Sequence, residues 1–128
     1  MMNGGDLNAM HKHLGTTGYE WLSRDPKVAV AFVADPLTFY ADALKLFVLV
    51  DALRLYGHPA KQLGKDVPLL IMIGSEDPLG GEKSVELLAT SYVKRSRLSD
   101  VDVLIDTEAR HEIFNELNRD EVNADLVK

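Results

Sequence analysis

The feature that most constrains the fold of this 128-residue chain is a short, uninterrupted apolar run from Val67 to Ile73. A run of this length, with a polar residue before it and a glycine after it, is typical of a parallel strand buried on both faces of a sheet. The stretch from Val101 to Ile105, in which Asp102 interrupts the apolar residues, indicates a second strand at or near a sheet edge. Helical periodicity from Glu82 to Ser96 lies between them, so the two strands are predicted to be parallel.

The remaining segments are predicted to be helical. Two Asp-Pro pairs, at 25–26 and 35–36, are typical of a helix N-cap followed by proline in the first turn. Apolar spacing, caps and stops predict helices over 7–14, over 27–33 and from 36 or 38 to 56, a helical turn around 113–117, and a last helix capped by Asp120. The expected fold class is therefore α/β, with a helical segment over 1–60 and a strand–helix–strand–helix part over 61–128.

Two parallel strands make a small sheet for such a fold. Each strand has one edge that its neighbour in the pair does not cover, and an uncovered edge is a template for another strand. We therefore expect the chain to correspond to part of a larger sheet. A homodimer that forms through the unpaired edge is one way to cover it.

Composition restricts the classes of function. The formal net charge of −6 argues against nucleic-acid binding, which needs a basic surface. The chain has no cysteine, and His11 and His13 are two residues apart and diverge on a helix, so neither a metal nor a cofactor is expected. The first residues do not resemble a signal peptide, and the longest apolar segment, 39–56, contains four charged residues. A cytoplasmic protein is the expectation.

Two residues in the predicted loops can carry chemistry. Asp77 follows the first strand, and His111 follows the second. Because the carboxyl ends of adjacent parallel strands lie at one edge of a sheet, about 4.8 Å apart, these side chains can be in contact. A carboxylate that fixes the tautomer of a histidine makes that histidine a competent general base. The alternatives are an ordinary strand-to-helix turn around Asp77 and a helix-capping or exposed His111.

An acid and a histidine in this order are the last two members of a hydrolytic triad whose first member is a serine. That serine should lie in a Gly-x-Ser-x-Gly turn, and no serine of this chain does. The glycine-rich stretch 74–84 could instead suggest a phosphate-binding loop, but Glu82 stands where that motif requires lysine. The chain alone is therefore predicted not to turn over a substrate.

Segments 67–78 and 106–116, together with 21–26 and 33–36, resemble the carboxyl-terminal part of α/β-hydrolases of the monoacylglycerol lipase, lysophospholipase and serine aminopeptidase type. The most specific element is the run His-Glu-Ile-Phe-Asn-Glu over 111–116. The resemblance implies a partial α/β-hydrolase fold, in which a remnant of the helical cap is followed by the two strands and their helices.

The resemblance also implies roles for individual residues. Asp77 corresponds to the catalytic acid of the family and His111 to its base, and the supporting residues that follow correspond to Glu112, Asn115 and Glu116. Asp106 departs from the family, which often has an aromatic or apolar residue there, and is expected to place an additional negative charge near the histidine.

These roles imply the carboxyl-terminal portion of a serine hydrolase that acts on carboxylic esters, such as lysophospholipids or monoacylglycerols. An ester or lipid substrate would bind only if the amino-terminal part were supplied. The alternative is a non-catalytic module that forms a homodimer or complements a separate amino-terminal chain.

Overall fold

The computed structural model describes residues 7–39, 57–61, 63 and 67–127. In chain order the elements are η1 (Asn8–Met10), α2 (Pro26–Ala34), β1 (Leu69–Gly74), α5 (Gly81–Ser91), the π-helical η2 (Tyr92–Ser96), β2 (Val101–Asp106), η3 (Ile113–Asn115) and α6 (Arg119–Leu126). Within these residues the strands form a two-stranded parallel sheet, in which Leu69 lies opposite Val101 and Gly74 opposite Asp106. The predicted α/β class and the parallel strand–helix–strand order are confirmed.

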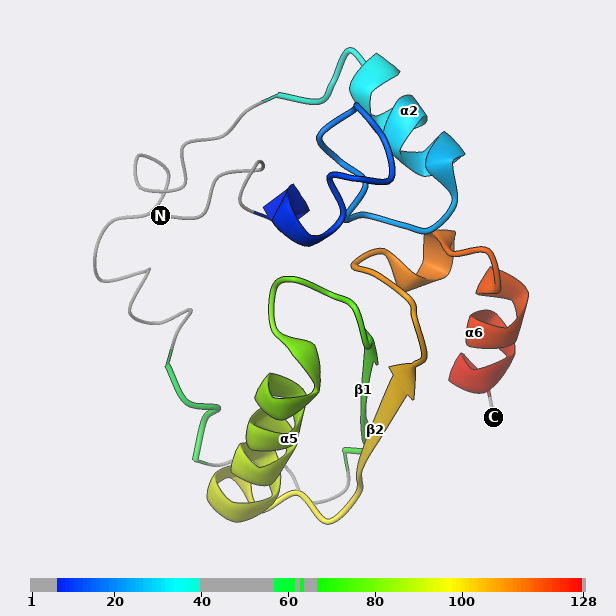
Figure 1. Ribbon diagram of the computed structural model, residues 1–128. Helices are drawn as coiled ribbons and strands as arrows, with labels where there is room; N and C mark the ends of the chain where they lie inside the picture. Colours follow the sequence, from blue (N-terminus) through cyan, green and yellow to red (C-terminus); the bar gives the residue numbers. More distant parts are fainter. Residues whose placement is uncertain (1–6, 40–56, 62, 64–66, 128) are drawn as a thin grey trace.

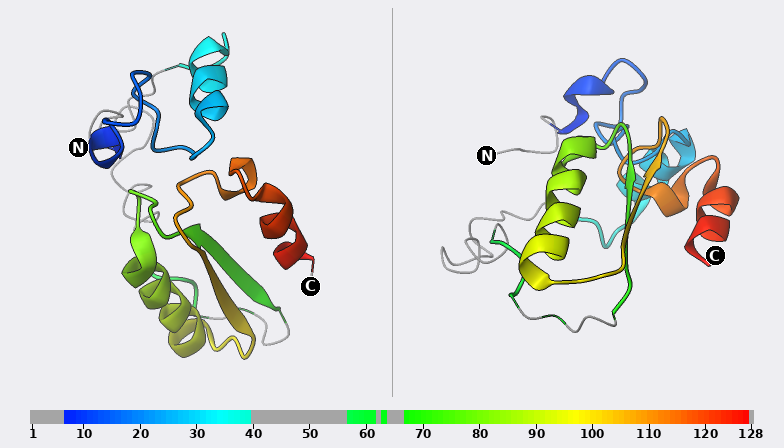
Figure 2. Two further views of the ribbon diagram at one scale, coloured as in Figure 1. Left: turned by 45° about the vertical axis from the view of Figure 1, so that its right-hand side comes forward. Right: turned by 90° about the horizontal axis from the view of Figure 1, so that it is seen from below.

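Helices α5 and α6 lie on opposite faces of the sheet (Figures 1 and 2). On the α6 side, Val122 packs with Ala109 and Ile113, and Met72 of β1 packs against this cluster. On the other side, α5 buries Val85. Both strand arrows point toward the segment of residues 7–39, drawn in blue and cyan in Figure 1, so the loops after the strands face that segment.

The helix predicted over 82–96 is present, but its last part is a π-helical turn. It ends where Arg97 adopts a left-handed conformation, with φ of 63°, and Leu98 N donates to Tyr92 O at 3.3 Å. The buried Ser96 hydroxyl donates to Ala60 O at 2.7 Å, and Arg95 Nε donates to Pro59 O at 2.8 Å. Residues 59–60 are thereby attached to the end of the helix.

The prediction for the first helix is wrong. A single 3-10 turn, Asn8–Met10, replaces the helix expected over 7–14. The buried side chain of Asn8 bonds to Glu20 and to the backbone of Trp21, and His11 Nε2 lies 3.3 Å from Glu76 O. Polar side chains with such tertiary partners compete with helical hydrogen bonds, so the segment follows these partners instead.

The two Asp-Pro pairs behave differently. Asp25 caps α2 as predicted, because its side chain accepts from Lys27 N at 3.0 Å and Pro26 is the first helical residue. The side chain of Asp35 accepts from Leu37 N at 2.8 Å, and its backbone carbonyl accepts from Thr38 N at 3.1 Å. These bonds form an isolated turn and not the first turn of a helix. The rest of that predicted helix, residues 40–56, lies outside the described residues.

The prediction that Asp120 caps the last helix is also wrong. α6 begins at Arg119 and has Asn118 at its N-cap position, whereas Asp120 lies in the first turn. The side chain of Asn118 does not cap the helix, because it is hydrogen-bonded to Asp106 and Arg24.

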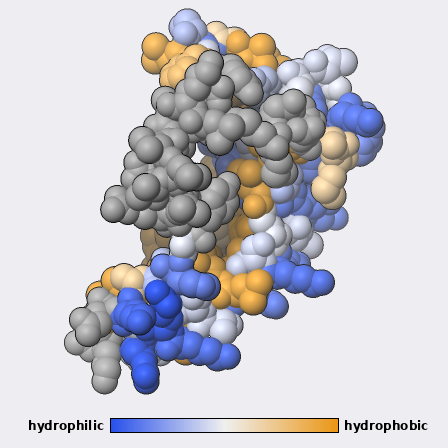
Figure 3. All heavy atoms as spheres, turned by 90° about the vertical axis from the view of Figure 1, so that its left-hand side faces the viewer, coloured by the Kyte–Doolittle hydropathy of each residue, from blue (hydrophilic) through white to orange (hydrophobic). Residues whose placement is uncertain are grey.

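Several apolar side chains lie exposed in the segment of residues 7–39, and Figure 3 shows apolar surface at that end of the molecule. They are Met10, Leu14, Val30, Val33, Leu37 and Phe39. Strand β1 was expected to be buried on both faces, but its Leu70 is 37% exposed. In the described part of the chain β1 has β2 as its one neighbouring strand. No helix among these residues is long and apolar enough to cross a bilayer.

Candidate active site

The loops that follow β1 and β2 are locked together by backbone hydrogen bonds. Ser75 N donates to Asp106 O and Glu76 N to Ala109 O, both at 2.9 Å, and Glu108 N donates to Ser75 Oγ at 2.8 Å. Gly74 is required where the loops cross, because a Cβ there would clash with the carbonyl oxygens of residues 109 and 110. The loops therefore cannot separate without breaking these contacts.

Asp77 and His111 are brought together at this crossing. His111 Nδ1 lies 3.0 Å from Asp77 Oδ2, and the other carboxylate oxygen, Oδ1, accepts from Leu79 N at 2.8 Å. The Asp77 side chain is 9% exposed, whereas that of His111 is 36% exposed. The carboxylate is thus fixed by the backbone on one side, and the imidazole is the accessible partner.

The histidine is held from its other side by the N-terminal segment. His111 N donates to Trp21 O at 3.4 Å, and Glu112 N donates to Leu22 O at 2.8 Å. The rings of Trp21 and His111 are 5.0 Å apart between centroids and tilted by 41°. A proton on Nδ1, donated to Asp77, leaves the lone pair of Nε2 free to accept a proton from a third group.

A buried glutamate supports the backbone beside the histidine. Glu116 is fully buried and accepts from Arg24 N, from Arg24 Nε at 2.9 Å and from Arg110 N at 2.8 Å. Arg24 also donates to Asn118 Oδ1 at 2.7 Å, and Asn118 Nδ2 donates to Asp106 Oδ1 at 3.0 Å. We call Arg24, Arg110, Glu116 and Asn118 the polar clamp, because they join the N-terminal segment to the residues around His111.

The remaining residues expected at the site have other partners. Glu112 accepts from Asn115 Nδ2 at 2.7 Å, so these two bond to each other. The Asp106 carboxylate is bound to the Asn118 amide. The sequence reasoning missed Arg24, Arg110 and Trp21, although the Ser-Arg-Asp-Pro run and the arginine directly before His111 were visible signals.

A second buried carboxylate belongs to the N-terminal segment. Burial alone would raise the pKa of Glu20, but hydrogen bonds from the hydroxyl and backbone of Thr17 and from the amide of Asn8 outweigh burial and lower the pKa to about 2. Gly15 lets this carboxylate approach the chain, since a Cβ there would lie 2.5 Å from Glu20 Oε1. Glu20 is therefore ionised at neutral pH.

A serine nucleophile is the element that this arrangement lacks. Within the described ranges no serine Oγ is hydrogen-bonded to His111; Ser23 Oγ, for example, donates to Asn115 O at 2.9 Å. No group of three histidine, aspartate or glutamate side chains in the same ranges could hold a metal ion. The described geometry thus provides a carboxylate and an imidazole held in contact.

Comparisons with known proteins identify the family and the fold. Residues 7–118 match the family model described as serine aminopeptidase, S33. Among solved structures the chain is similar to a highly thermostable carboxyl esterase from Bacillus coagulans, crystallised in complex with glycerol, with a TM-score of 0.74 and 23% identity. The similarity covers 96% of this chain and 41% of the esterase, so the chain spans less than half of that protein. No curated protein sequence matches the chain.

The esterase shares the fold, and the family model covers most of the chain, including Asp77 and His111. The parallel strands, the helices on both faces and the two loops that meet beyond the strand ends correspond to part of an α/β-hydrolase. The chain belongs to the serine aminopeptidase S33 family of α/β-hydrolases.

Proposed function

We propose that the chain provides the acid and the base of a serine hydrolase that acts on carboxylic esters of the lysophospholipid or monoacylglycerol type. The observation that carries the proposal is the 3.0 Å contact between Asp77 Oδ2 and His111 Nδ1, which lies between two loops locked to each other. We further propose that the chain is inactive until an amino-terminal part supplies the serine and the oxyanion hole.

In this proposal Asp77 orients His111, and Nε2 of His111 transfers the proton. Asp77 accepts the proton on Nδ1 of His111, which fixes the tautomer and stabilises the imidazolium once it forms. Nε2 removes the proton of the serine hydroxyl as the oxygen attacks the ester carbonyl, and then returns it to the departing alcohol. Trp21 packs against the imidazole and keeps its plane in place.

The test has two stages. The purified chain is first assayed with p-nitrophenyl butyrate, and its rate should equal that of the Asp77→Ala and His111→Ala variants. The chain is then co-expressed with the part of the Bacillus coagulans esterase that the similarity does not cover, as the source of the proposed serine. Turnover should appear and fall about 10³-fold or more in either variant.

Two results would contradict the proposal. One is turnover by the chain alone that disappears in both variants, because the chain would then hold a nucleophile of its own. The other is a complemented enzyme whose rate is unchanged in both variants. Assays with a lysophospholipid and a monoacylglycerol then distinguish the two proposed ester classes.

A second candidate is a non-catalytic association module, which the exposure of Leu70 on a strand with one described neighbour favours. Sedimentation velocity should then show a dimer that Leu70→Lys converts to a monomer. Leu87→Lys, at an exposed position on α5, is the control. A wild-type chain that stays monomeric at all concentrations would exclude this candidate.

A further inference from the structure

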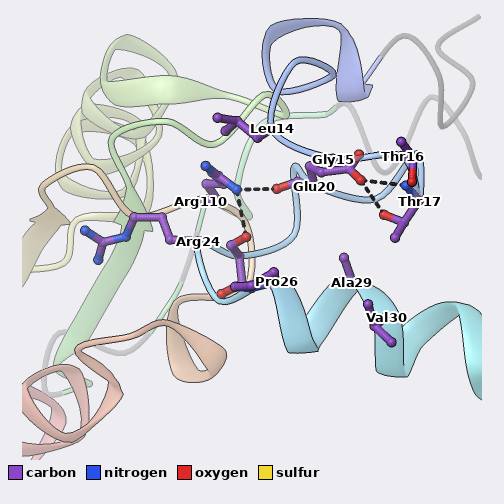
Figure 4. Close-up of a pocket in the computed structure, with 11 residues that line it drawn as sticks. Leu14, Gly15, Thr16, Thr17, Glu20, Arg24, Pro26, Ala29, Val30 and Arg110 are labelled. Atoms are coloured by element: carbon purple, nitrogen blue, oxygen red, sulfur yellow. Dashed lines mark hydrogen bonds between the residues drawn. The ribbon is translucent and has the colours of Figure 1, made fainter.

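The backbone around His111 is bound to consecutive carbonyl groups of the N-terminal segment, those of residues 20–23. The two inner carbonyl oxygens, of residues 21 and 22, accept from the backbone N–H groups of His111 and Glu112 at 3.4 and 2.8 Å. The two outer ones, of residues 20 and 23, accept from Nη1 of Arg110 at 2.7 and 2.8 Å (Figure 4). Arg110 is buried, so its bonds are shielded from water. Residues 20–23 and the loop that carries His111 therefore form one fixed unit.

The buried side chain of Asn8 attaches the turn η1 to this unit. Its Nδ2 donates to Glu20 Oε2 at 2.6 Å, and its Oδ1 accepts from Trp21 N at 3.0 Å. The backbone carbonyl of Asn8 accepts from His11 N at 2.9 Å, and His11 is the residue that ends the turn. His11 is thereby connected, through Asn8, to the unit that carries His111.

His11 is a buried ionisable residue that the proposed proton transfer does not use. It is 4% exposed, whereas His13, two residues later, is exposed. Nε2 of the His11 ring lies 3.3 Å from the carbonyl oxygen of Glu76. A carbonyl oxygen can only accept, so a hydrogen bond at this contact requires the proton of the ring on Nε2. Among the described residues His11 is the one donor to this oxygen.

The carbonyl group of Glu76 belongs to the peptide unit that leads into Asp77. The N–H group of the same unit donates to Gly74 O at 3.2 Å, a contact within the loop itself. The plane of a peptide unit includes the Cα atom of the following residue, so a bond to the oxygen of Glu76 helps to fix the Cα atom of Asp77. His11 thus ties the loop that carries the acid to the N-terminal segment.

We propose that His11 is a positioning residue, which holds the Asp77 carboxylate against Nδ1 of His111 through the carbonyl group of Glu76. The N-terminal segment is already bound to the loop of the base, so a donor from this segment to the loop of the acid sets the separation of acid and base. In this role His11 acts through Glu76 and Asp77 and transfers no proton itself. The inference rests on the proposed function, in which Asp77 orients His111.

The test is NMR spectroscopy of the purified chain with isotope-labelled histidine, which reports the ring nitrogen that carries the proton. With neutral rings, the wild type should have His11 protonated at Nε2 and His111 protonated at Nδ1. His11→Phe keeps a ring but removes the donor, and should lower the fraction of His111 protonated at Nδ1 about twofold or more. His11→Gln retains an N–H donor and should keep this fraction close to that of the wild type.

His13→Phe is the matched control, because it makes the same substitution at an exposed position of the same segment. Three results would overturn the proposal: an unchanged Nδ1 fraction in His11→Phe, an equal decrease in His13→Phe, or a decrease in His11→Gln as large as in His11→Phe. Circular dichroism establishes whether the variants are folded. If His11→Phe does not fold, the wild type decides, because His11 protonated at Nδ1 and bare at Nε2 could not donate to Glu76.

The NMR measurement needs neither an ester nor a serine, so its outcome is separate from that of the turnover assays. In a complemented enzyme that turns over, His11→Phe should lower kcat about tenfold and leave KM within about twofold, because it misplaces the acid without touching the substrate. Equal kcat values for His11→Phe and His13→Phe would contradict the positioning role. Absence of all turnover would instead contradict the proposed function, and the ring protonation of His11 and His111 would then decide the role of His11.

Discussion

The N-terminal segment, residues 7–34, and the strand–helix–strand part, residues 69–106, are stabilised by different kinds of side chain. The first buries Asn8, His11, Glu20 and Ser23 as well as apolar residues, and is attached through the polar clamp. The second buries Val85, Leu98 and Ser96, and its Met72 packs against the apolar cluster of Ala109, Ile113 and Val122. Polar groups need particular partners at particular distances, whereas apolar groups need mainly volume and shape. Single substitutions should therefore have larger effects in the first region than in the second.

The largest effect is expected for Glu116→Ala. The substitution removes the acceptor of Arg24 and of the Arg110 backbone, and leaves a partly buried guanidinium with its main partner lost. The free energy of unfolding should fall by about 3–5 kcal/mol in urea titrations. Glu121→Ala, at an exposed position on α6, is the control and should change it by less than about 0.5 kcal/mol. If Glu116→Ala lowered the free energy of unfolding by less than about 1 kcal/mol, the polar clamp would not be more sensitive to substitution than the apolar packing.

The next effect is a dependence of stability on pH. The carboxyl of Glu20 has a pKa of about 2 in the folded protein and an ordinary pKa of 4.5, so the unfolded chain binds more protons between these pH values. Stability due to Glu20 is thus complete above about pH 4.5 and is lost as pH falls toward 2. The contribution is on the order of 3 kcal/mol.

Urea titrations of the wild type and Glu20→Gln from pH 6 to pH 2 measure this contribution. The variant should show a shallower decline than the wild type over the acid range. Parallel curves for the two proteins would mean that the Thr17 and Asn8 hydrogen bonds do not favour the charged form.

A third prediction concerns the crossing of the two loops that follow β1 and β2. Gly74→Ala should destabilise the protein by about 1–3 kcal/mol, because the added methyl group clashes with the backbone at residues 109–110 and pushes the two loops apart. Gly80→Ala is the matched control, since its Cβ would lie 3.4 Å from Ser84 Cβ, an ordinary contact. Thermal unfolding of both variants decides whether the crossing is as tight as described.

The smallest effect is expected inside the apolar part. Met72 packs against the Ala109, Ile113 and Val122 cluster, and Met72→Leu conserves the volume of the side chain. The free energy of unfolding should change by less than about 1.5 kcal/mol. If Met72→Leu lowered the free energy of unfolding as much as Glu116→Ala does, this cluster would be as sensitive to substitution as the polar clamp.

The same contrast explains which parts of the fold follow from the sequence. The strands and the intervening helix were predictable because an apolar run and a helical stripe each identify an element locally. The Asp77–His111 contact followed from strand order and direction, which place both loops at one edge of the sheet.

The N-terminal segment was harder to predict, because its conformation depends on distant partners. Asn8 and His11 bond to Glu20 and Glu76, and Asn118 bonds to Asp106 rather than capping α6. No local pattern reports such contacts. The role of Arg24 was missed for the same reason, since Arg24 and its partner Glu116 are 92 residues apart.

The contact between Trp21 and His111 has a practical consequence. Trp21 is the only tryptophan of the chain, and its ring lies 5.0 Å from the imidazole. The protein thus contains its own fluorescent reporter at the place where the N-terminal segment meets Asp77 and His111. A displacement of the loop that carries His111 can be followed from the intrinsic emission of this indole without adding a label.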